Sequence, residues 1–359
     1  MHYELSPQNT VMVCGPASVI LLSGQATILG APLRPHGTKT ILRQRQMPIE
    51  TGTHAELEIT GDSARILHAH TSTIPHSWKL AAVALKQMLE GAAVILGPPD
   101  VGKSTLCVYL LNTLLQDGKH VCVIDADIGQ TDIGPPTTIA RAIPTRPILS
   151  LQELTPDRAF FIGHISPSGV EPKLINGIQR LLAKREKSIT IINTDGWITS
   201  LDATVYKIDM LTQVKPDLVL GLGFSNELDP ILDAVTQRSL KITAAKHALE
   251  RSRVDRRRMR SEGYRRFLHG AVTRLMNPEN AKFSFPPGLG TDTTLKLSAL
   301  KNLIVGILNS QGYLTQIGIL ESINRDHAFI YSRHTEAFDK IDVGYVKLST
   351  SGNEIGFLE

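Results

Sequence analysis

The chain has 359 residues, of which 42% are hydrophobic and 5% aromatic, and its net charge is +4. This length suits two or three globular domains, and so mild a charge neither requires nor excludes a nucleic-acid partner. The three cysteines form no CxxC or Cys/His cluster, so the sequence indicates no zinc site and fits a reducing cytoplasm. The first residues lack the pattern of a signal peptide, and no apolar run approaches the roughly 18 residues of a membrane span. We therefore expect a cytoplasmic protein without a membrane partner.

Residues 1–77 are predicted to form a small N-terminal β domain. Val11–Val13 and Val19–Leu22 are short apolar stretches separated by glycine and proline, which is typical of strands and turns. Residues 56–60 alternate polar and apolar side chains with a period of two, as a half-buried strand does. No catalytic cluster is evident in this part of the chain.

Residues 78–285 are predicted to form an α/β core. Continuous apolar runs suited to strands buried on both faces alternate with stretches of helical spacing such as Ser104–Leu115. This alternation predicts a mainly parallel sheet covered on both faces. The predicted strands are Ala92–Leu96, Val121–Ile124, Ala159–Ile162, Ile189–Ile192 and Leu218–Leu220. Trp78, at the start of this core, has no site-like context and is expected to be packed inside.

Residues 286–359 are predicted to form a small C-terminal β domain. The stretch 276–293 is rich in proline, glycine and asparagine and is interpreted as a linker. Short apolar strands follow it at Leu303–Leu308, Ile317–Ile323, Ala328–Tyr331 and Gly344–Leu348.

A phosphate-binding loop is the strongest motif in the sequence. It follows a predicted buried strand, precedes an amphipathic helix and matches the pattern G-x-x-x-x-G-K-[ST]. Its residues, all predicted to bind nucleotide, are Gly97, Pro98, Pro99, Asp100, Val101, Gly102, Lys103, Ser104 and Thr105. Lys103 is expected to reach the β- and γ-phosphates and the Ser104 hydroxyl to hold Mg²⁺. For Thr105, a phosphate contact and a plain place in the first helical turn are equally open.

The next predicted strand runs into a second, acidic loop that contains Asp125, Asp127 and Gln130. A carboxylate at the carboxyl end of a parallel strand lies on the ligand edge of the sheet. There it holds Mg²⁺ through water or accepts a proton from an attacking hydroxyl. We assign that work to Asp127 and leave Asp125 to hydrogen-bond the P-loop. Gln130 is expected to bind on the substrate side and could orient either the magnesium-bound water or the attacking hydroxyl.

A strongly basic segment at 250–270 is a helix candidate. Between residues 251 and 266 the arginines outnumber the acids, Asp255 and Glu262, and arginine suits planar, bidentate contacts with phosphate. Helical spacing places Arg253, Arg256, Arg257 and Arg260 on one face. The alternative is a solvated helix, or one that binds an RNA tail.

These motifs occur in the order seen in polyribonucleotide 5′-hydroxyl-kinases, and the chain resembles that family over nearly its whole length. The family includes archaeal RNA kinases and the kinase subunits of eukaryotic mRNA 3′-end cleavage and tRNA splicing complexes. The basic segment looks like the family's arginine lid. The other segments that carry the resemblance are the P-loop, Asp127-Ile128-Gly129-Gln130, Gly163-His164-Ile165-Ser166-Pro167, Asn193-Thr194-Asp195-Gly196-Trp197 and the closing Gly352-Asn353-Glu354-Ile355-Gly356.

The resemblance implies a P-loop core between two β domains, with the N-terminal domain helping to hold the adenine. ATP and Mg²⁺ are the implied cofactors, and the implied partner is RNA or DNA with a 5′-hydroxyl end. Trp197, a tryptophan in a ligand-edge loop of an aromatic-poor chain, would stack on the terminal base, and Thr194 would contact the adjoining phosphate. The alternative for Trp197 is a tryptophan packed in the core. Arg251 and Arg256 would contact the transferred phosphoryl group. Arg257 and Arg260 are expected to bind substrate. They are also the next candidates for the phosphoryl contact if Arg251 and Arg256 do not make it.

Three functions are compatible with these features. The first is an ATP-dependent kinase that phosphorylates the 5′-hydroxyl end of RNA or DNA. The second is an NTPase that drives assembly, which needs a positioned water and leaves Trp197 and the lid arginines without a role. The third is an ATP-binding scaffold for RNA processing, against which the presence of Lys103, Ser104 and Asp127 argues.

Overall fold

The computed structural model describes residues 1–43, 45–61, 65–183, 187–246, 250–278, 281–286, 299–324, 326–333 and 340–358. The chain divides into two compact units. The first consists of Met1–Val123, Ile143–Leu154 and Arg185–Glu250, and the second of Ile124–Ala142, Thr155–Lys184 and Arg251–Glu359. Among the described residues, no helix has the length and apolar character needed to span a membrane.

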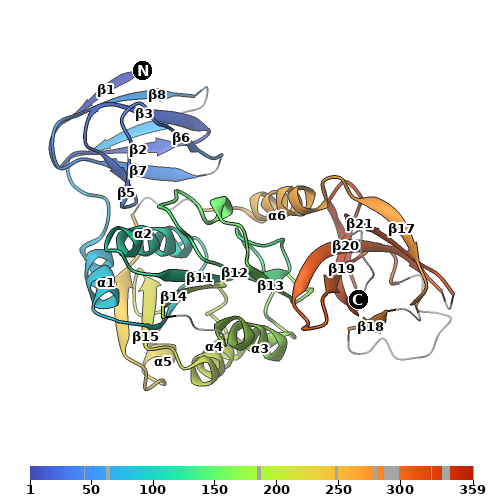
Figure 1. Cartoon of the computed structure of the whole chain (residues 1–359). Coiled ribbons are helices and arrows are strands. Elements are labelled where there is room, and N and C mark those ends of the chain that lie inside the picture. The colour runs from blue at the N-terminus through green and yellow to red at the C-terminus, as the bar shows by residue number, and fades with distance from the viewer. Residues whose placement is uncertain are drawn as a thin grey trace. The chain divides into compact units, whose positions relative to one another are not determined.

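Among the described residues, the N-terminal part of the first unit consists of strands β1 to β9, arranged in two antiparallel sheets. Several of these strands are labelled in Figure 1. One sheet has the order β1-β8-β3-β6 and the other the order β5-β4-β7-β2-β9. Buried and less buried side chains alternate along β8, as its period-two sequence predicts. The strands are β1 (His2–Leu5), β2 (Thr10–Cys14), β3 (Ala17–Gly24), β4 (Thr27–Ile28), β5 (Ala31–Pro32), β6 (Thr38–Ile41), β7 (Gln46–Glu50), β8 (Ala55–Thr60) and β9 (Arg65–Ala69).

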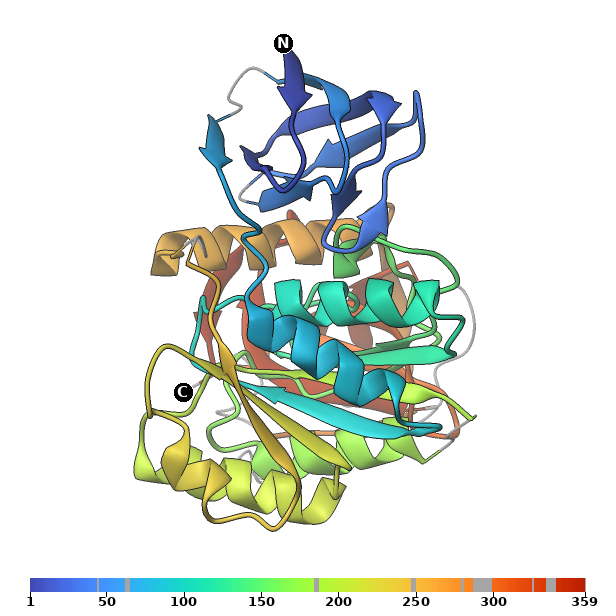
Figure 2. The ribbon, with the colours of Figure 1, turned by 90° about the vertical axis from the view of Figure 1, so that its left-hand side faces the viewer.

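The rest of the first unit is a parallel sheet with helices on both faces, in the order β14-β10-β15-β16. All six residues of β10 are buried, as its continuous apolar run predicts. Helices α1 and α2 pack side by side on one face (Figure 2), where Trp78 is buried and donates to the Thr243 carbonyl. The elements are α1 (His76–Lys86), β10 (Gly91–Leu96), α2 (Lys103–Gln116), a 3₁₀ turn (Leu151–Glu153), β14 (Ile189–Thr194), α4 (Leu201–Val214), β15 (Leu218–Gly223), α5 (Asp229–Leu232) and β16 (Ser239–Thr243).

Strand β11 (Val121–Ala126) leads from the first unit into the second. There β12 (Thr138–Ala142) pairs antiparallel with β13 (Arg158–Phe161), so the predicted strand at 159–162 is real but not parallel to its partner. Helix α3 (Glu171–Leu182) packs against this pair, and α6 (Arg253–Leu268) supplies the predicted arginine-rich helix. The mainly parallel α/β core with flanking β regions is confirmed.

The C-terminal sheet completes the second unit, with the order β17-β21-β20-β19-β22-β18 and β23 paired to β22. Tyr264 and Leu268 of α6 share a hydrophobic core with this sheet. The sheet also includes two strands from before residue 286, one of which lies inside the predicted linker, while residues 279–280 and 287–293 of that linker fall outside the described residues. The strands are β17 (Val272–Met276), β18 (Lys282–Ser284), β19 (Leu303–Leu308), β20 (Leu314–Ile323), β21 (Ala328–Ser332), β22 (Lys340–Leu348) and β23 (Glu354–Phe357).

Candidate active site

The phosphate-binding loop joins β10 to α2, as the motif predicts. Gly97 is needed because a Cβ there would lie 2.2 Å from the Leu222 carbonyl oxygen, and Gly102 has a left-handed φ of 96°. Among the described residues, no side chain makes a capping hydrogen bond at the start of α2, where the first N–H groups of a helix can meet phosphate oxygens. Lys103 is only 7% exposed, and its ammonium donates to the carbonyls of Gly97 and Pro98 at 2.9 and 2.8 Å. The loop is therefore folded around its own lysine.

The end of β14 lies directly beside this loop. The Asn193 amide donates to the Ser104 hydroxyl at 3.3 Å. A Cβ on Gly196 would lie 2.7 Å from the Pro99 nitrogen, so only glycine allows this close approach. The fold thus brings the predicted substrate loop at 194–197 against the predicted nucleotide loop. Asn193 was missed as a site residue, although a polar side chain that ends a buried apolar run was a usable signal.

Thr194 and Trp197 lie differently within the substrate loop. The Thr194 hydroxyl is buried and donates to the Ile95 carbonyl at 2.7 Å, which fastens the loop to β10. Its contact with a substrate phosphate stays a prediction. The Trp197 ring is only partly buried and stacks on Tyr206 of α4, with ring centroids 5.9 Å apart and an interplanar angle of 26°. Trp197 is therefore not a fully enclosed core residue, and its stacking on a base also stays a prediction.

A buried ionic network supports this loop from below. The Asp195 carboxylate accepts hydrogen bonds from the Trp197 backbone N–H at 2.9 Å, the Tyr206 hydroxyl at 3.1 Å and the Lys207 ammonium at 2.8 Å. Lys207 also donates to the Asp195 carbonyl, and its side chain has no exposed surface. A fully buried lysine on α4 gave no signal in the sequence, because its spacing is that of an ordinary polar helix face.

In the second unit, the two acidic-loop carboxylates have different surroundings. Asp125 is completely buried and accepts from the Thr131 hydroxyl at 3.1 Å and the Asp132 N–H at 2.7 Å. These two hydrogen bonds shape the acidic loop itself, while the predicted bond from Asp125 to the P-loop stays a prediction. Asp127 is partly exposed and accepts from the Gln130 N–H at 3.1 Å. Of the two, Asp127 has the exposure that a reacting carboxylate needs.

Helix α6, the predicted arginine lid, contacts the same acidic loop. The Gln130 amide donates to the Arg256 carbonyl at 3.4 Å, and the Arg266 guanidinium donates to the carbonyls of Asp132 and Ile133. Ser252 and Asp255 form a capping box at the start of α6. Arg251 therefore lies just before the N-cap residue Ser252. Asp127, Gln130 and the lid are thereby gathered in one unit.

Two of the predicted substrate-side arginines bind Glu354 of β23 in this structure. The Arg260 guanidinium binds both oxygens of this carboxylate, and Arg257 donates to its backbone carbonyl. Burial by itself lowers the pKa of Arg260, but the Glu354 hydrogen bond and charge, helped by Tyr264 and Asp127, raise it above the ordinary value. Arg260 therefore joins the lid to the C-terminal sheet, and substrate contacts by Arg257 and Arg260 remain predictions. The closing motif at 352–356 was the signal for Glu354.

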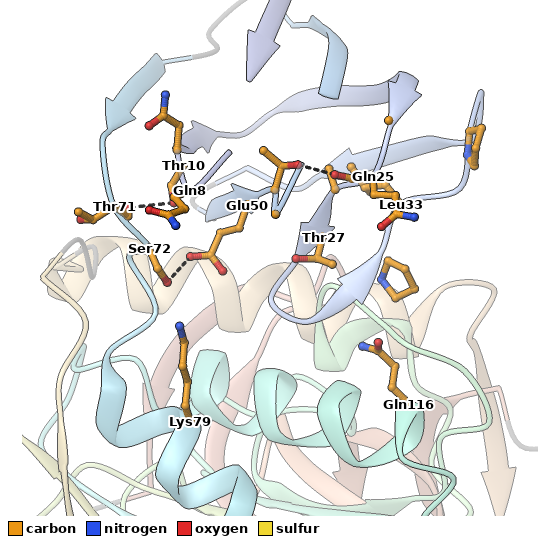
Figure 3. A pocket seen from close by; sticks show the side chains of 17 residues that line it. Gln8, Thr10, Gln25, Thr27, Leu33, Glu50, Thr71, Ser72, Lys79 and Gln116 are labelled. Atoms are coloured by element: carbon orange, nitrogen blue, oxygen red, sulfur yellow. Dashed lines mark hydrogen bonds between the residues drawn. The ribbon is translucent and has the colours of Figure 1, made fainter. Parts of the chain in front are cut away.

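A separate polar cavity of about 1020 Å³ lies in the first unit, between turns of the N-terminal strands and helices α1 and α2 (Figure 3). Lys79 and Gln116 extend toward it from the helices, and on the opposite wall Glu50 accepts from the Ser72 hydroxyl. Gln116 ends α2, about 20 Å along the helix from Lys103. This wall of the cavity is thus distant from the phosphate loop.

Comparison with known proteins agrees with this geometry. The family described as the mRNA cleavage and polyadenylation factor CLP1 P-loop matches residues 97–270. The polyribonucleotide 5′-hydroxyl-kinase of Pyrococcus horikoshii is 28% identical over 80% of this chain and 95% of its own. That of Pyrococcus furiosus is 28% identical over 74% and 90%. Over most of its length, the chain is similar to polyribonucleotide 5′-hydroxyl-kinases.

Eukaryotic kinases are also similar to this chain. The polyribonucleotide 5′-hydroxyl-kinase Clp1 of Xenopus tropicalis is 26% identical over 71% of this chain and 63% of its own. Among solved structures, Clp1p in its complex with Pcf11p superimposes with a TM-score of 0.74 at 13% identity, covering 97% of this chain and 98% of that one. At that identity the likeness shows the shared fold. The P-loop of this kinase family implies the use of ATP.

Proposed function

We propose that this chain is a kinase that transfers the γ-phosphate of ATP to the 5′-hydroxyl end of RNA, with DNA as a second acceptor to be tested. The observation that carries the proposal is the close approach of the 194–197 loop to the P-loop, through Gly196 on Pro99 and Asn193 on Ser104. An NTPase needs only a water beside the nucleotide. An aromatic ring in a loop packed on the P-loop instead suits a nucleic-acid acceptor.

Each part of the proposed reaction is assigned to particular residues of this chain. Lys103 leaves the carbonyls of Gly97 and Pro98 for the β- and γ-phosphates, where its charge balances the phosphoryl group in transfer. Asp127 accepts the proton of the attacking 5′-hydroxyl, and Gln130 orients it. Arg251 and Arg256 meet the negative charge that spreads over the equatorial oxygens. Trp197 stacks on the terminal base and Thr194 completes the acceptor side.

Magnesium fits the donors present on these loops. The Ser104 hydroxyl and the Asp127 carboxylate are hard oxygen ligands of the kind Mg²⁺ prefers. No group of three or more His, Cys, Asp or Glu side chains suited to a metal occurs among the described residues. An ion held by Ser104 and Asp127 would neutralise the negative charge that develops during phosphoryl transfer.

End-labelling tests the proposal directly. A 5′-hydroxyl RNA, its 5′-phosphorylated counterpart and a 5′-hydroxyl DNA are incubated with γ-labelled ATP, while phosphate release is followed in parallel. We expect label on the 5′-hydroxyl RNA alone among the two RNAs, and at least ~10²-fold less with Lys103→Ala. Phosphate release without labelling would identify an NTPase, and ATP binding without either reaction would identify a scaffold.

A further inference from the structure

The second unit contains a cavity of about 410 Å³ that the proposed kinase chemistry does not use. Its walls come from β13, β20, α6 and the neighbouring loops, through Arg158, Gln316, Phe267, Leu314, Pro135 and Arg333. Phe267, Leu314 and Pro135 supply apolar surface, whereas the two arginines and the Gln316 amide supply hydrogen-bond donors. The cavity therefore combines apolar walls with cationic groups.

Among the described residues, the acidic residue that lines this cavity, Asp157, does not pair with the cavity's arginines. The Asp157 carboxylate, which also lines it, is taken up by Arg141 through two 3.1 Å hydrogen bonds from the same guanidinium nitrogen. Arg158 and Arg333 make no ion pair within the part of the chain that the structure describes. One terminal nitrogen of Arg158 is buried without a hydrogen-bond partner among those residues, a costly arrangement that an anionic ligand would relieve.

An aromatic ring stands beside these arginines. Two guanidinium groups lie near the Tyr313 ring, with the Arg158 carbon 5.4 Å and the Arg180 carbon 5.0 Å from its centroid. Arg180 also covers the Phe160 ring at 5.1 Å. Arginines interleaved with aromatic rings are typical of surfaces that follow a single-stranded nucleic acid, since they serve both phosphates and bases.

The cavity shares its framework with the candidate catalytic groups of the same unit. Pro135 lies in the segment that continues from the Asp127–Gln130 loop, and the Arg266 guanidinium ties α6 to the carbonyls of Asp132 and Ile133. Phe267, the next residue of α6, lines the cavity. A strand whose 5′ end is held by the acidic loop and lid would thus have a second cationic site on the same unit.

We propose that this cavity, through Arg158 and Arg333, binds a backbone phosphate of the acceptor nucleic acid several nucleotides from its 5′ end. The inference rests on the proposed function for its substrate but concerns binding, which is measurable without turnover. It makes the enzyme favour long acceptors over very short ones. It assigns no part in the chemical step to either arginine.

Fluorescence anisotropy with 5′-hydroxyl RNAs of 4 and 20 nucleotides tests this site. The proteins are the wild type, Arg158→Gln, Arg333→Gln and the double variant, with Arg238→Gln as a matched loss of charge at an exposed arginine that does not line the cavity. We expect Arg158→Gln and Arg333→Gln to weaken binding of the 20-mer and leave the 4-mer unchanged. Affinity for the 20-mer falls when salt is raised from about 50 to 200 mM. In a variant that lacks one phosphate contact, this fold-loss should be about threefold smaller than in the wild type.

Several outcomes would overturn the inference. Wild-type affinity of the double variant for the 20-mer would do so, as would equal losses for both lengths or an equal loss in Arg238→Gln. Because Arg158 is partly buried, Arg333→Gln keeps the test valid if Arg158→Gln fails to fold. Inorganic phosphate is titrated as a separate arm, and its capture with unchanged RNA affinity would mean a free-anion site instead. Absence of phosphoryl transfer at every length would contradict the proposed function but leave these binding results decisive.

Discussion

The Lys207 ammonium lies 2.8 Å from the Asp195 carboxylate beneath the substrate loop, and their side chains are 0% and 5% exposed. Removing one partner of a buried pair leaves the other charge uncompensated, which costs about 3–5 kcal/mol. Because Asp195 also accepts from the Trp197 N–H and the Tyr206 hydroxyl, the pair holds both the fold and the loop.

We therefore expect Lys207→Met to lower the free energy of unfolding by about 3–5 kcal/mol, measured by urea denaturation. The matched control is Lys241→Met, which removes the exposed partner of Asp229 and should change stability little. In the folded fraction of Lys207→Met, KM for the RNA should rise while KM for ATP holds. Equal stability losses in both variants would contradict the buried-pair argument.

The two acidic-loop carboxylates should separate in their effects. Asp127→Asn keeps the shape but removes the proton acceptor, so kcat should fall by about 10²–10⁴-fold with ATP affinity retained. Asp125→Asn disturbs a buried carboxylate that holds the Thr131 hydroxyl and the Asp132 N–H, so its main effect should be on thermal stability. Single-turnover rates, calorimetric ATP titration and melting curves give the three readouts. Near-normal turnover of Asp127→Asn would mean that Asp127 is not the working carboxylate.

Stacking predicts a distinct result for Trp197→Ala. Without a ring to stack on the base, RNA binding should weaken by about 1–3 kcal/mol, similarly for all four terminal bases, while ATP binding stays unchanged. Trp197→Phe should restore most of the affinity because it keeps a flat ring. The control Tyr206→Phe keeps the ring under Trp197 but removes the hydroxyl bond to Asp195. A folding defect with unchanged RNA affinity in Trp197→Ala would favour a purely structural ring.

The lid arginines should divide into chemical and structural groups. Arg256→Lys keeps the charge but loses the planar fork, so kcat should fall toward the ~10³-fold low end of arginine-finger effects. Arg260→Lys instead breaks the bidentate pair with Glu354, so it should lower thermal stability, and Glu354→Gln should do the same. Measurements of kcat and KM at two salt concentrations complete the comparison. If Arg256→Lys keeps wild-type kcat and only its KM depends on salt, the lid acts merely as a binding surface.

Local patterns in the sequence were enough to predict the elements that carry the site. The run at 92–96 and the glycine-rich motif after it indicated a buried strand, a phosphate loop and a helix, because strand burial, loop curvature and helix start all depend on neighbouring residues. The arginine-dense segment likewise predicted helix α6, whose capping box is local. Trp78 was correctly expected in the core.

Only the tertiary structure decided what each of these polar groups contacts. It placed Gly196 on Pro99, Glu354 on Arg260 and Lys207 under Asp195, pairs that are separated by 97, 94 and 12 positions in the chain. It also showed that the predicted strand at 159–162 pairs antiparallel with β12. A period or motif describes one segment and its own faces. Which segments meet depends on the burial and pairing of the whole chain, so the surroundings of a charged side chain are fixed only when the fold is complete.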